Sequence, residues 1–360
     1  MKYRSSLLLP AEDLGGAGTK TIDIDVDKPI SRIEMTFKTT KASQGMSAPA
    51  PANIPKIELV DGSTILHSLT GYENQALAYY SRKGVVMDHG QHISTLSEVD
   101  IYTIDFGRWL WDQLLAFDPK RFSNPQLKVT WDEDVSDTSA TVNALEVWAH
   151  IFDELKASPI GFLSAKEHHS YTCGAENSFE HIALPEDRPI RQLLVRAYRD
   201  GYEPWTTIDE ARLDEGTLDR IPWEFTDLEM YYRRMKSHWP MITQQLAFIA
   251  DTGALTFYVP MTDYYAGFAG AGLGATTELF HSNASSKGGK MVIDASANTN
   301  ALAIVFGYLP WHSYQFPMGL KDEIEDWYDP AGKKPRLRLR AGSNGTNGTG
   351  QVVIEELFKY

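Results

Sequence analysis

The sequence predicts an all-β protein made of two antiparallel β-sandwiches of the jelly-roll type, a double jelly roll, with one short helix per copy. Three observations support this prediction. Most of the chain alternates apolar and polar residues with the period of a strand, helix signals are few, and one set of features occurs twice in the same order. An ordered repeat of this kind indicates a duplicated unit.

Period-two alternation identifies the strands. Residues 22–27 read Ile-Asp-Ile-Asp-Val-Asp, and similar alternation covers residues 126–131 and 145–151. This pattern is typical of a sheet with one dry and one wet face. A metal site at the three aspartates is the less favoured interpretation, because carboxylates on one side of a strand more often form a solvated edge that discourages unwanted pairing.

Four features of the first half recur in the second half. The matched pairs are Pro29 with Pro189, Thr70 with Thr226, Phe106 with Phe306, and Pro125 with Pro335. They lie 160 (189 − 29), 156 (226 − 70), 200 (306 − 106) and 210 (335 − 125) residues apart. The increase from 156 to 200 predicts an insertion of 44 residues in the second copy, between about Pro240 and Asn298.

This repeat divides the chain into an N-terminal arm (1–17), a first jelly roll (18–156), a linker (157–176) and a second jelly roll (177–360). The linker is assigned because residues 157–176 have no clear period. The insertion at about 240–298 contains a predicted hairpin at 246–259 and an Ala/Gly-rich run at 266–275. We expect it to form a loop or tower on the outer surface, where long loops tend to carry recognition.

Each copy contains one helix with a recognisable start. Thr70 with Glu73, and Thr226 with Glu229, have the spacing of a capping box, in which a hydroxyl and a carboxylate satisfy free backbone N–H groups. Gly84 and Pro240 are the expected helix ends.

Composition limits the classes of protein. A chain of 360 residues with 42% hydrophobic residues can bury two cores, and its single cysteine, Cys173, allows no intrachain disulfide. The apolar run within the first ten residues is too short for a signal peptide. No apolar run of the chain approaches the roughly 18 residues of a membrane span. The net charge of −14 argues against wrapping nucleic acid. The basic run at 333–340 alternates with leucines, which favours a solvated or subunit-facing strand over a nucleic-acid site.

No catalytic, cofactor-binding or metal-binding residues are predicted. His168, His169 and Cys173 carry metal-binding atoms without the spacing of a tetrahedral site, so a polar linker is favoured. The run from Gly270 to Gly274 lacks the spacing of a phosphate-binding loop. The sequons at Asn283, Asn344 and Asn347 are interpreted as turns.

Two further groups of residues keep a carbohydrate function open. The acidic pairs Asp209-Glu210 and Asp214-Glu215 carry the residue type that glycosidases use. Trp205, Trp223, Trp239 and Trp311 could form a sugar-stacking platform, although tryptophans in a large sandwich are more often core or interface anchors.

The duplicated sandwich and the runs 57–63, 69–77, 106–108 and 117–127 resemble the double jelly-roll major capsid proteins of tailless icosahedral viruses. That lineage includes membrane-containing bacteriophages and the adenovirus hexon. The resemblance implies a structural protein without enzymatic activity or cofactor, forming homotrimeric pseudo-hexagonal capsomers of an icosahedral virion assembled in the host cytoplasm.

The same resemblance implies its partners: further copies of the chain, other virion proteins such as penton or minor capsid proteins, and often an internal viral membrane. It implies no direct sequence-specific binding of nucleic acid. The alternatives are a carbohydrate-binding or glycan-cleaving double β-sandwich protein and a virion spike or receptor-binding protein, since fold alone does not decide function.

Overall fold

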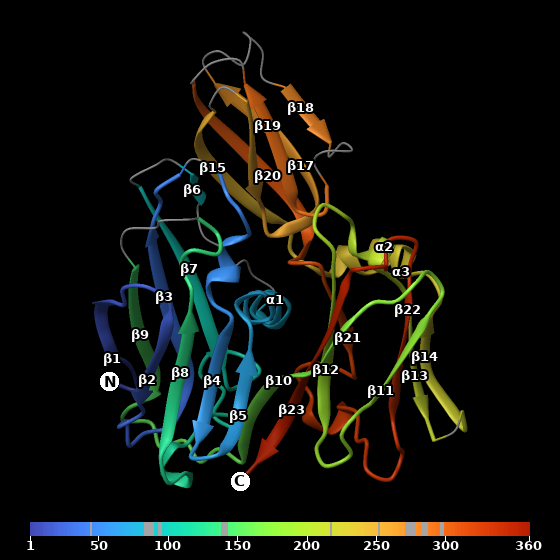
Figure 1. Cartoon of the computed structure of the whole chain (residues 1–360). Helices are drawn as coiled ribbons and strands as arrows, with labels where there is room; N and C mark the ends of the chain where they lie inside the picture. Colours follow the sequence, from blue (N-terminus) through green and yellow to red (C-terminus); the bar gives the residue numbers. More distant parts are fainter. Residues whose placement is uncertain are drawn as a thin grey trace.

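Two β-sandwiches stand side by side in the computed structural model, and a smaller β-body lies above the gap between them (Figure 1). The structure describes residues 1–43, 45–82, 90–92, 96–137, 143–216, 218–250, 253–270, 278–281, 287–295 and 299–360. The predicted fold class is confirmed.

The first roll packs two four-stranded arrays around one core. The outer sheet has the order β1 (Tyr3–Asp13), β9 (Asn143–Phe152), β3 (Ile30–Thr40), β7 (Ser97–Asp105). The inner array has the order β2 (Gly18–Asp23), β8 (Pro125–Trp131), β4 (Lys56–Asp61), β5 (Thr64–Leu69). Their alternating apolar side chains, such as Ile33, Met35 and Phe37 of β3, are almost fully buried between the arrays.

The second roll repeats this strand order. One array is β10 (Gly161–Thr172), β23 (Thr349–Lys359), β12 (Ile190–Tyr198), β21 (Ser313–Pro317). The other is β11 (Phe179–Ala183), β22 (Arg336–Ala341), β13 (Ile208–Glu215), β14 (Arg220–Phe225). Even a ladder irregularity recurs, between Ile30 and Arg32 in β3 and between Ile190 and Gln192 in β12. Matching topology and register confirm the duplication.

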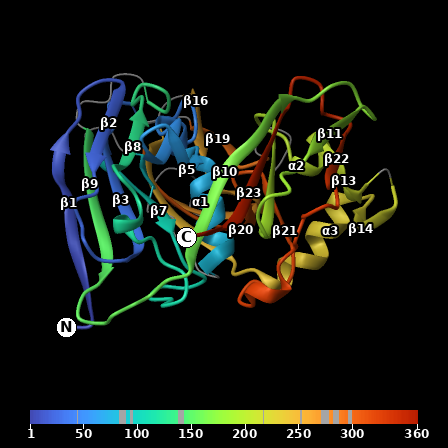
Figure 2. The same ribbon diagram turned by 90° about the horizontal axis from the view of Figure 1, so that it is seen from below.

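The two rolls share a sheet. The strand β5 of the first roll meets β10 of the second in a parallel pairing at Ser68 and Lys166, which joins the inner array and the array of β10 into eight strands. The helix α1 (Gly71–Arg82) lies between the rolls (Figures 1 and 2). Its capping box is confirmed, since the Thr70 N–H donates to Glu73 Oε2 at 2.8 Å and the Glu73 N–H donates to Thr70 Oγ1 at 3.3 Å.

The remaining helices are short. The helix α3 (Leu228–Met235) occupies the place of α1 in the second roll, but its cap is Asp227, which accepts from the Met230 N–H at 2.9 Å. The prediction that Thr226 caps this helix is therefore wrong by one residue. The other short helices are α2 (Pro204–Thr207), η1 (Ala50–Asn53), η2 (Pro119–Arg121), η3 (Lys236–His238) and η4 (Ile324–Asp326). No helix in the described part of the chain is long and apolar enough to span a membrane.

The third body is the tower. Its five-stranded sheet has the order β18 (Glu278–His281), β17 (Met261–Gly270), β20 (Thr299–Pro310), β15 (Ile242–Ala250), β6 (Gly90–His92), and β16 (Gly253–Tyr258) pairs with β19 (Lys290–Ala295). The first roll contributes the edge strand β6, so the tower belongs to both rolls. Gly84 and residues 271–277 lie outside the described residues.

Two predictions about the insertion are wrong. Both edges of β15 are paired, with β20 and β6, so β15 and β16 do not form the predicted hairpin. The strand β20 belongs to the tower, so Phe306 is not the counterpart of Phe106. Ladder positions match β7 with β21 instead, because Ile104 lies opposite Ile33 and Phe316 lies opposite Leu193. The inserted segment therefore extends to Pro310, beyond the predicted limit at Asn298.

The predicted linker and arm are also partly wrong. Most of residues 157–176 form β10, which lies in the middle of the eight-stranded sheet. Its first five residues are all buried, so the strand lacks the alternation by which a half-exposed strand is recognised. Within the predicted arm, β1 pairs with β9 and so belongs to the first roll.

Deleting residues 350–360 is predicted to prevent soluble expression. The strand β23 is hydrogen-bonded to β10 on one side and β12 on the other, and Val352, Val353 and Leu357 are buried. Its loss would leave backbone groups of both neighbours unpaired and remove apolar area from the core. The soluble fraction after expression measures the effect. Lys359→Ala, at the exposed end of the same strand, should stay soluble; a soluble, assembling truncation would show that β23 is dispensable.

Candidate functional site

The candidate metal ligands named by the sequence do not converge. His168 Nε2 lies 2.7 Å from the Ala183 carbonyl oxygen and His169 Nε2 lies 3.0 Å from Glu180 Oε1. Cys173 is buried beside Tyr171, and burial raises the pKa of its thiol to about 11. Across the described residues, no three or more His, Cys, Asp or Glu side chains come together as a metal site.

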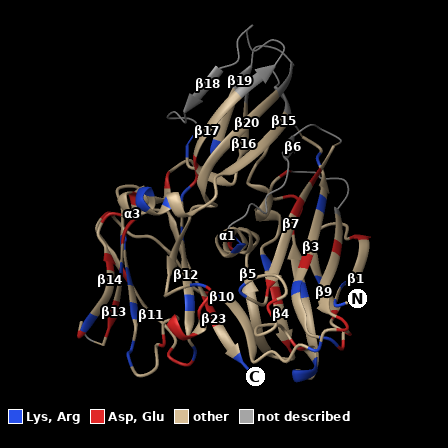
Figure 3. Cartoon of the chain, turned by 180° about the vertical axis from the view of Figure 1, so that it is seen from behind, with Lys and Arg blue, Asp and Glu red and all other residues tan. Residues whose placement is uncertain are grey.

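The acidic pairs of β13 are held in ion pairs with arginines. Asp209 accepts from Arg340 Nε at 2.8 Å, and Glu210 pairs with Arg338. The second pair behaves in the same way: Asp214 lies 2.6 Å from Arg212 Nε, and Glu215 lies 3.1 Å from Arg220 Nη1. Figure 3 shows the opposite charges interleaved on this sheet. These four carboxylates are therefore engaged with arginines and do not form a pair that faces across a cleft. The same ion pairs largely neutralise the arginines of β22.

The tryptophans pack against the interior. Trp205 stacks on Tyr232 with ring centroids 5.6 Å apart, and Trp223 stacks on Phe316 at 5.0 Å. Trp239 and Trp311 are buried at the junction of the rolls. Two of the three sequon asparagines, Asn344 and Asn347, lie in the turn before β23. The third, Asn283, and the glycines Gly272 and Gly274 of the run from Gly270 to Gly274 lie outside the described residues.

Buried polar side chains gather at the junction between the rolls, where α1 lies on the outward face of β12 and β23. Arg191 Nη1 donates to Glu355 Oε2 at 2.8 Å, and Gln192 Nε2 donates to the same oxygen at 2.6 Å. Gln192 Nε2 also lies 3.2 Å from Ser81 Oγ of α1. All these side chains except Ser81 are at most 3% exposed. Sequence reasoning missed this site because its residues are far apart in the chain.

A second chain of polar contacts runs beneath the start of α1. Arg196 Nη1 donates to Gln351 Oε1 at 2.6 Å, and Gln351 Nε2 donates to Glu167 Oε2 at 2.6 Å. Glu73 is a close neighbour of Glu167 at this end of α1. Burial, and then the neighbouring charge of Glu167, raise the pKa of Glu73 to about 8, so its carboxyl is protonated at neutral pH.

Aromatic side chains of α1 complete the junction. The Tyr72 ring covers the Arg196 guanidinium at 4.2 Å, the Tyr79 hydroxyl donates to the Pro240 carbonyl at 2.5 Å, and the Tyr80 hydroxyl donates to the Ser313 carbonyl at 2.6 Å. From the second roll, Trp311 Nε1 donates to Gln75 Oε1 at 2.7 Å. One helix of the first roll thus anchors three separate segments of the second.

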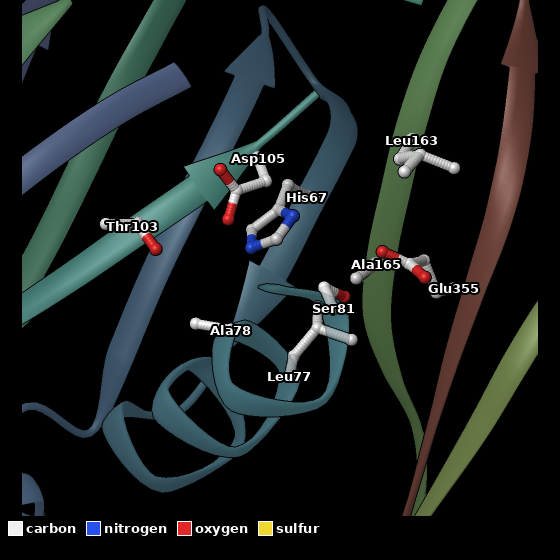
Figure 4. Close-up of a pocket in the computed structure, with 9 residues that line it drawn as sticks. All are labelled: His67, Leu77, Ala78, Ser81, Thr103, Asp105, Leu163, Ala165 and Glu355. Atoms are coloured by element: carbon white, nitrogen blue, oxygen red, sulfur yellow. The ribbon is translucent and has the colours of Figure 1, made fainter. Parts of the chain in front are cut away.

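A small cavity of about 10 Å³ lies within the junction, with His67 on one side and Glu355 on the other (Figure 4). Its size corresponds to about one water molecule. Neither ring nitrogen of His67 has a hydrogen-bond partner among the described residues. Burial lowers the pKa of His67 to about 3, so the imidazole is neutral over the physiological range.

A larger groove of about 580 Å³ lies beside α3, at the far side of the second roll. Phe225, Met230, Tyr231 and Met235 provide apolar lining, and Glu224, Asp227 and Arg234 lie among them. Met230 is 44% exposed although its helix is the counterpart of the buried helix α1.

Solved structures similar to this chain are viral capsid proteins. The major capsid protein of Sulfolobus turreted icosahedral virus matches with a TM-score of 0.61 at 10% identity, over 100% of this chain and 97% of that one. The major capsid protein of bacteriophage PM2 matches with 0.56 at 9% identity, over 99% and 98%. The VP54 protein of PBCV-1 matches with 0.54 at 10% identity, over 99% and 93%.

This chain has the double jelly-roll fold of those capsid proteins. No protein-family model and no curated protein sequence matches it. At about 10% identity the similarity is one of fold, and it does not extend to the individual side-chain contacts described above.

Acidification is predicted to destabilise the protein through His67. The folded-state pKa lies below the ordinary value of 6.5, so the unfolded chain takes up the proton first and stability falls as pH drops from about 6.5 towards about 3. The slope is roughly 1.4 kcal/mol per pH unit for one such group. Melting temperatures between pH 7 and pH 4 should fall less steeply for His67→Gln than for the wild type. His312, also buried with its pKa lowered to about 3, keeps part of the slope in the variant; unchanged slopes would contradict the assignment.

Alkaline conditions are predicted to act through Glu73 in the opposite direction. Its folded-state pKa is raised above the ordinary 4.5, so stability falls as pH rises from about 4.5 to about 8, by roughly 1.4 kcal/mol per unit. Glu73→Gln mimics the protonated carboxyl and can still accept from the Thr70 N–H. We expect it to melt above the wild type at pH 8 to 9 and close to it at pH 4.5. The exposed Glu176→Gln is the control; equal melting of wild type and Glu73→Gln at pH 9 would refute the prediction.

Proposed function

We propose that this protein is a major capsid protein of an icosahedral virus and that three copies form a pseudo-hexagonal capsomer. The observation that carries the proposal is the repeat of one roll, with the same strand order, side by side in one chain. Two similar wedges per chain supply two sixths of a ring, so three chains complete it with closed symmetry. Similarity to capsid proteins along the whole chain supports the same function.

Surface chemistry is consistent with a tile in a shell. The net charge is −14, and the arginines of β22 are paired with acids of β13 and β14, which leaves little positive charge for gripping a genome. We propose that the partners are further copies of the chain and other virion proteins, such as penton or minor capsid proteins, and an internal membrane where the virus has one. The location is the virion, after assembly in the host cytoplasm.

The carbohydrate alternative has less support. The carboxylates that it would use are ion-paired on β13, and the tryptophans that it would use pack against the interior. A spike or receptor-binding protein remains the second alternative, and the tower is the part of the chain that would serve it.

Light scattering of the purified protein is predicted to give about three times the chain mass of 40.4 kDa. Negative-stain images of the same sample, or of its source particle, should show hexagonal tiles. A stable monomer without tiles would overturn the capsid proposal and favour the carbohydrate alternative.

A further inference from the structure

We infer that the outward face of the first roll's outer sheet (β1-β9-β3-β7) and the groove beside α3 in the second roll are the two halves of one interface between copies of this chain. The inference rests on the proposed capsomer and names the surfaces that meet in it. The partner is a second copy of this chain, and the model for the contact is the junction inside the chain itself.

The first step compares equivalent sheet faces. In the second roll, the outward residues Gln192, Leu194 and Arg196 of β12 are 0%, 2% and 6% exposed, because the first roll covers them. Their counterparts in β3 are Arg32, Glu34 and Thr36, and all three are partly exposed. The register proves the match, since Gln192 lies opposite Glu355 and Arg32 lies opposite His150, each directly after the same irregularity.

The second step compares the helices. In each roll a helix follows the second strand of the corresponding strand pair. The helix α1 follows β4 and β5, and α3 follows β13 and β14. The helix α1 covers the neighbouring roll and is buried along most of its length. The helix α3 buries Leu228, Tyr231 and Tyr232 against its own roll and leaves Met230 exposed over the groove. A first roll placed against α3 would cover this groove as the second roll covers α1.

The third step compares sheet edges. Inside the chain, β5 meets β10, and the corresponding strands are β14 and β1. Both of these are edge strands whose outer edge has no strand beside it among the described residues. Figures 1 and 2 show β1 at one end of the molecule and β14 with α3 at the other end. They therefore cannot meet within one chain, but they can meet head to tail between chains, and such a contact forms a closed ring when its rotation closes.

The chemistry of the two surfaces is complementary. Near β1, Leu7 is 43% exposed and Trp148 of the adjacent β9 is half-buried. On the other half, Met230 and Ile221 are 44% and 43% exposed. Such apolar groups gain from mutual burial.

Both surfaces carry charges of both signs. The outward face of the first roll carries Glu34, Glu146 and Arg32, and the groove is lined by Arg234, Glu224 and Asp227. Opposite charges at matching surfaces favour one register of association over others.

The ladder positions specify a pair of residues that should come close between copies. Ser68 and Lys166 are the paired residues inside the chain. Glu224 corresponds to Ser68, because Glu224 lies opposite Arg212 as Ser68 lies opposite Glu58. Ser6 corresponds to Lys166, because Ser6 lies opposite Ala149 as Lys166 lies opposite Ile354.

Thiol cross-linking of the full chain tests this pair. The double variant Ser6→Cys/Glu224→Cys is treated with a short bifunctional maleimide after its native mass has been measured by light scattering. We expect covalent dimers and trimers on a denaturing gel. The single variants Ser6→Cys and Glu224→Cys are matched controls that should stay at monomer mass, because the native Cys173 is buried.

The two proposals fail in different ways in this experiment. A native trimer whose double variant gives no covalent dimers would overturn the assigned interface and leave the capsomer standing. A native monomer would overturn both.

A second pair of variants covers the case in which the cysteine substitutions disturb folding. Leu7→Glu places a charge on the inferred interface, and Leu320→Glu places one at a residue that is 61% exposed outside it. We expect Leu7→Glu to shift the native mass towards the monomer and Leu320→Glu to leave the trimer intact. At a low protein concentration both variants should melt at the temperature of the wild type, which would show that they are folded. A Leu7→Glu protein that still forms trimers would overturn the interface.

Discussion

The structure depends on the burial of a polar sheet face. In an isolated sandwich the outward side chains of β12 and β23 would face water, yet here the first roll covers them. A buried polar group without a partner loses its hydration and gains nothing in return. Gln192 is matched within its own sheet by Glu355 and across the junction by Ser81 of α1. The hydrogen bonds of Tyr80 to Ser313 and of Trp311 to Gln75 also cross the junction, and these contacts set the relative position of the rolls.

Such a junction also fixes protonation states. Burial favours the neutral form of a titratable group, and it is the largest cause of both the lowered pKa of His67 and the raised pKa of Glu73. Arg191 pairs with Glu355 in the same environment, with 2.8 Å between Arg191 Nη1 and Glu355 Oε2. Both partners belong to the second roll, on the neighbouring strands β12 and β23. Loss of one partner would be costly, because the other would remain as an uncompensated buried charge.

The two copies of the roll have diverged where their surroundings differ. Strand order and the irregularity before Arg32 and Gln192 are kept, because they are set within each sandwich. Along β3 the inward residues are buried and the outward residues are at least partly exposed, whereas every residue of β12 up to Ala197 is buried. The tower adds a further difference, since it is inserted in the second copy and takes its edge strand β6 from the first.

Local pattern was enough to predict the strands that are wet on one face. Alternation identified β8, β9 and β22, the duplication followed from the order of short motifs, and the capping box placed the start of α1. The strand predicted at residues 22–27 is largely wrong, because β2 ends at Asp23 and residues 24–27 are not in a strand. The helix start at Asp227 was missed because a neighbouring threonine and glutamate had the same spacing.

The sequence by itself determined the fold class, the duplication and the lack of a recognisable catalytic motif, because these depend on periodicity and residue type. Tertiary structure alone decided what β10 and β20 do. The start of β10 is buried on both faces and has no alternation to read, and β20 carries a Phe-Gly motif that imitates the end of β7 while pairing within the tower. The junction site was likewise beyond the sequence, because Gln192 and Glu355 come from distant segments of the second roll and meet Ser81 only when the first roll covers the second.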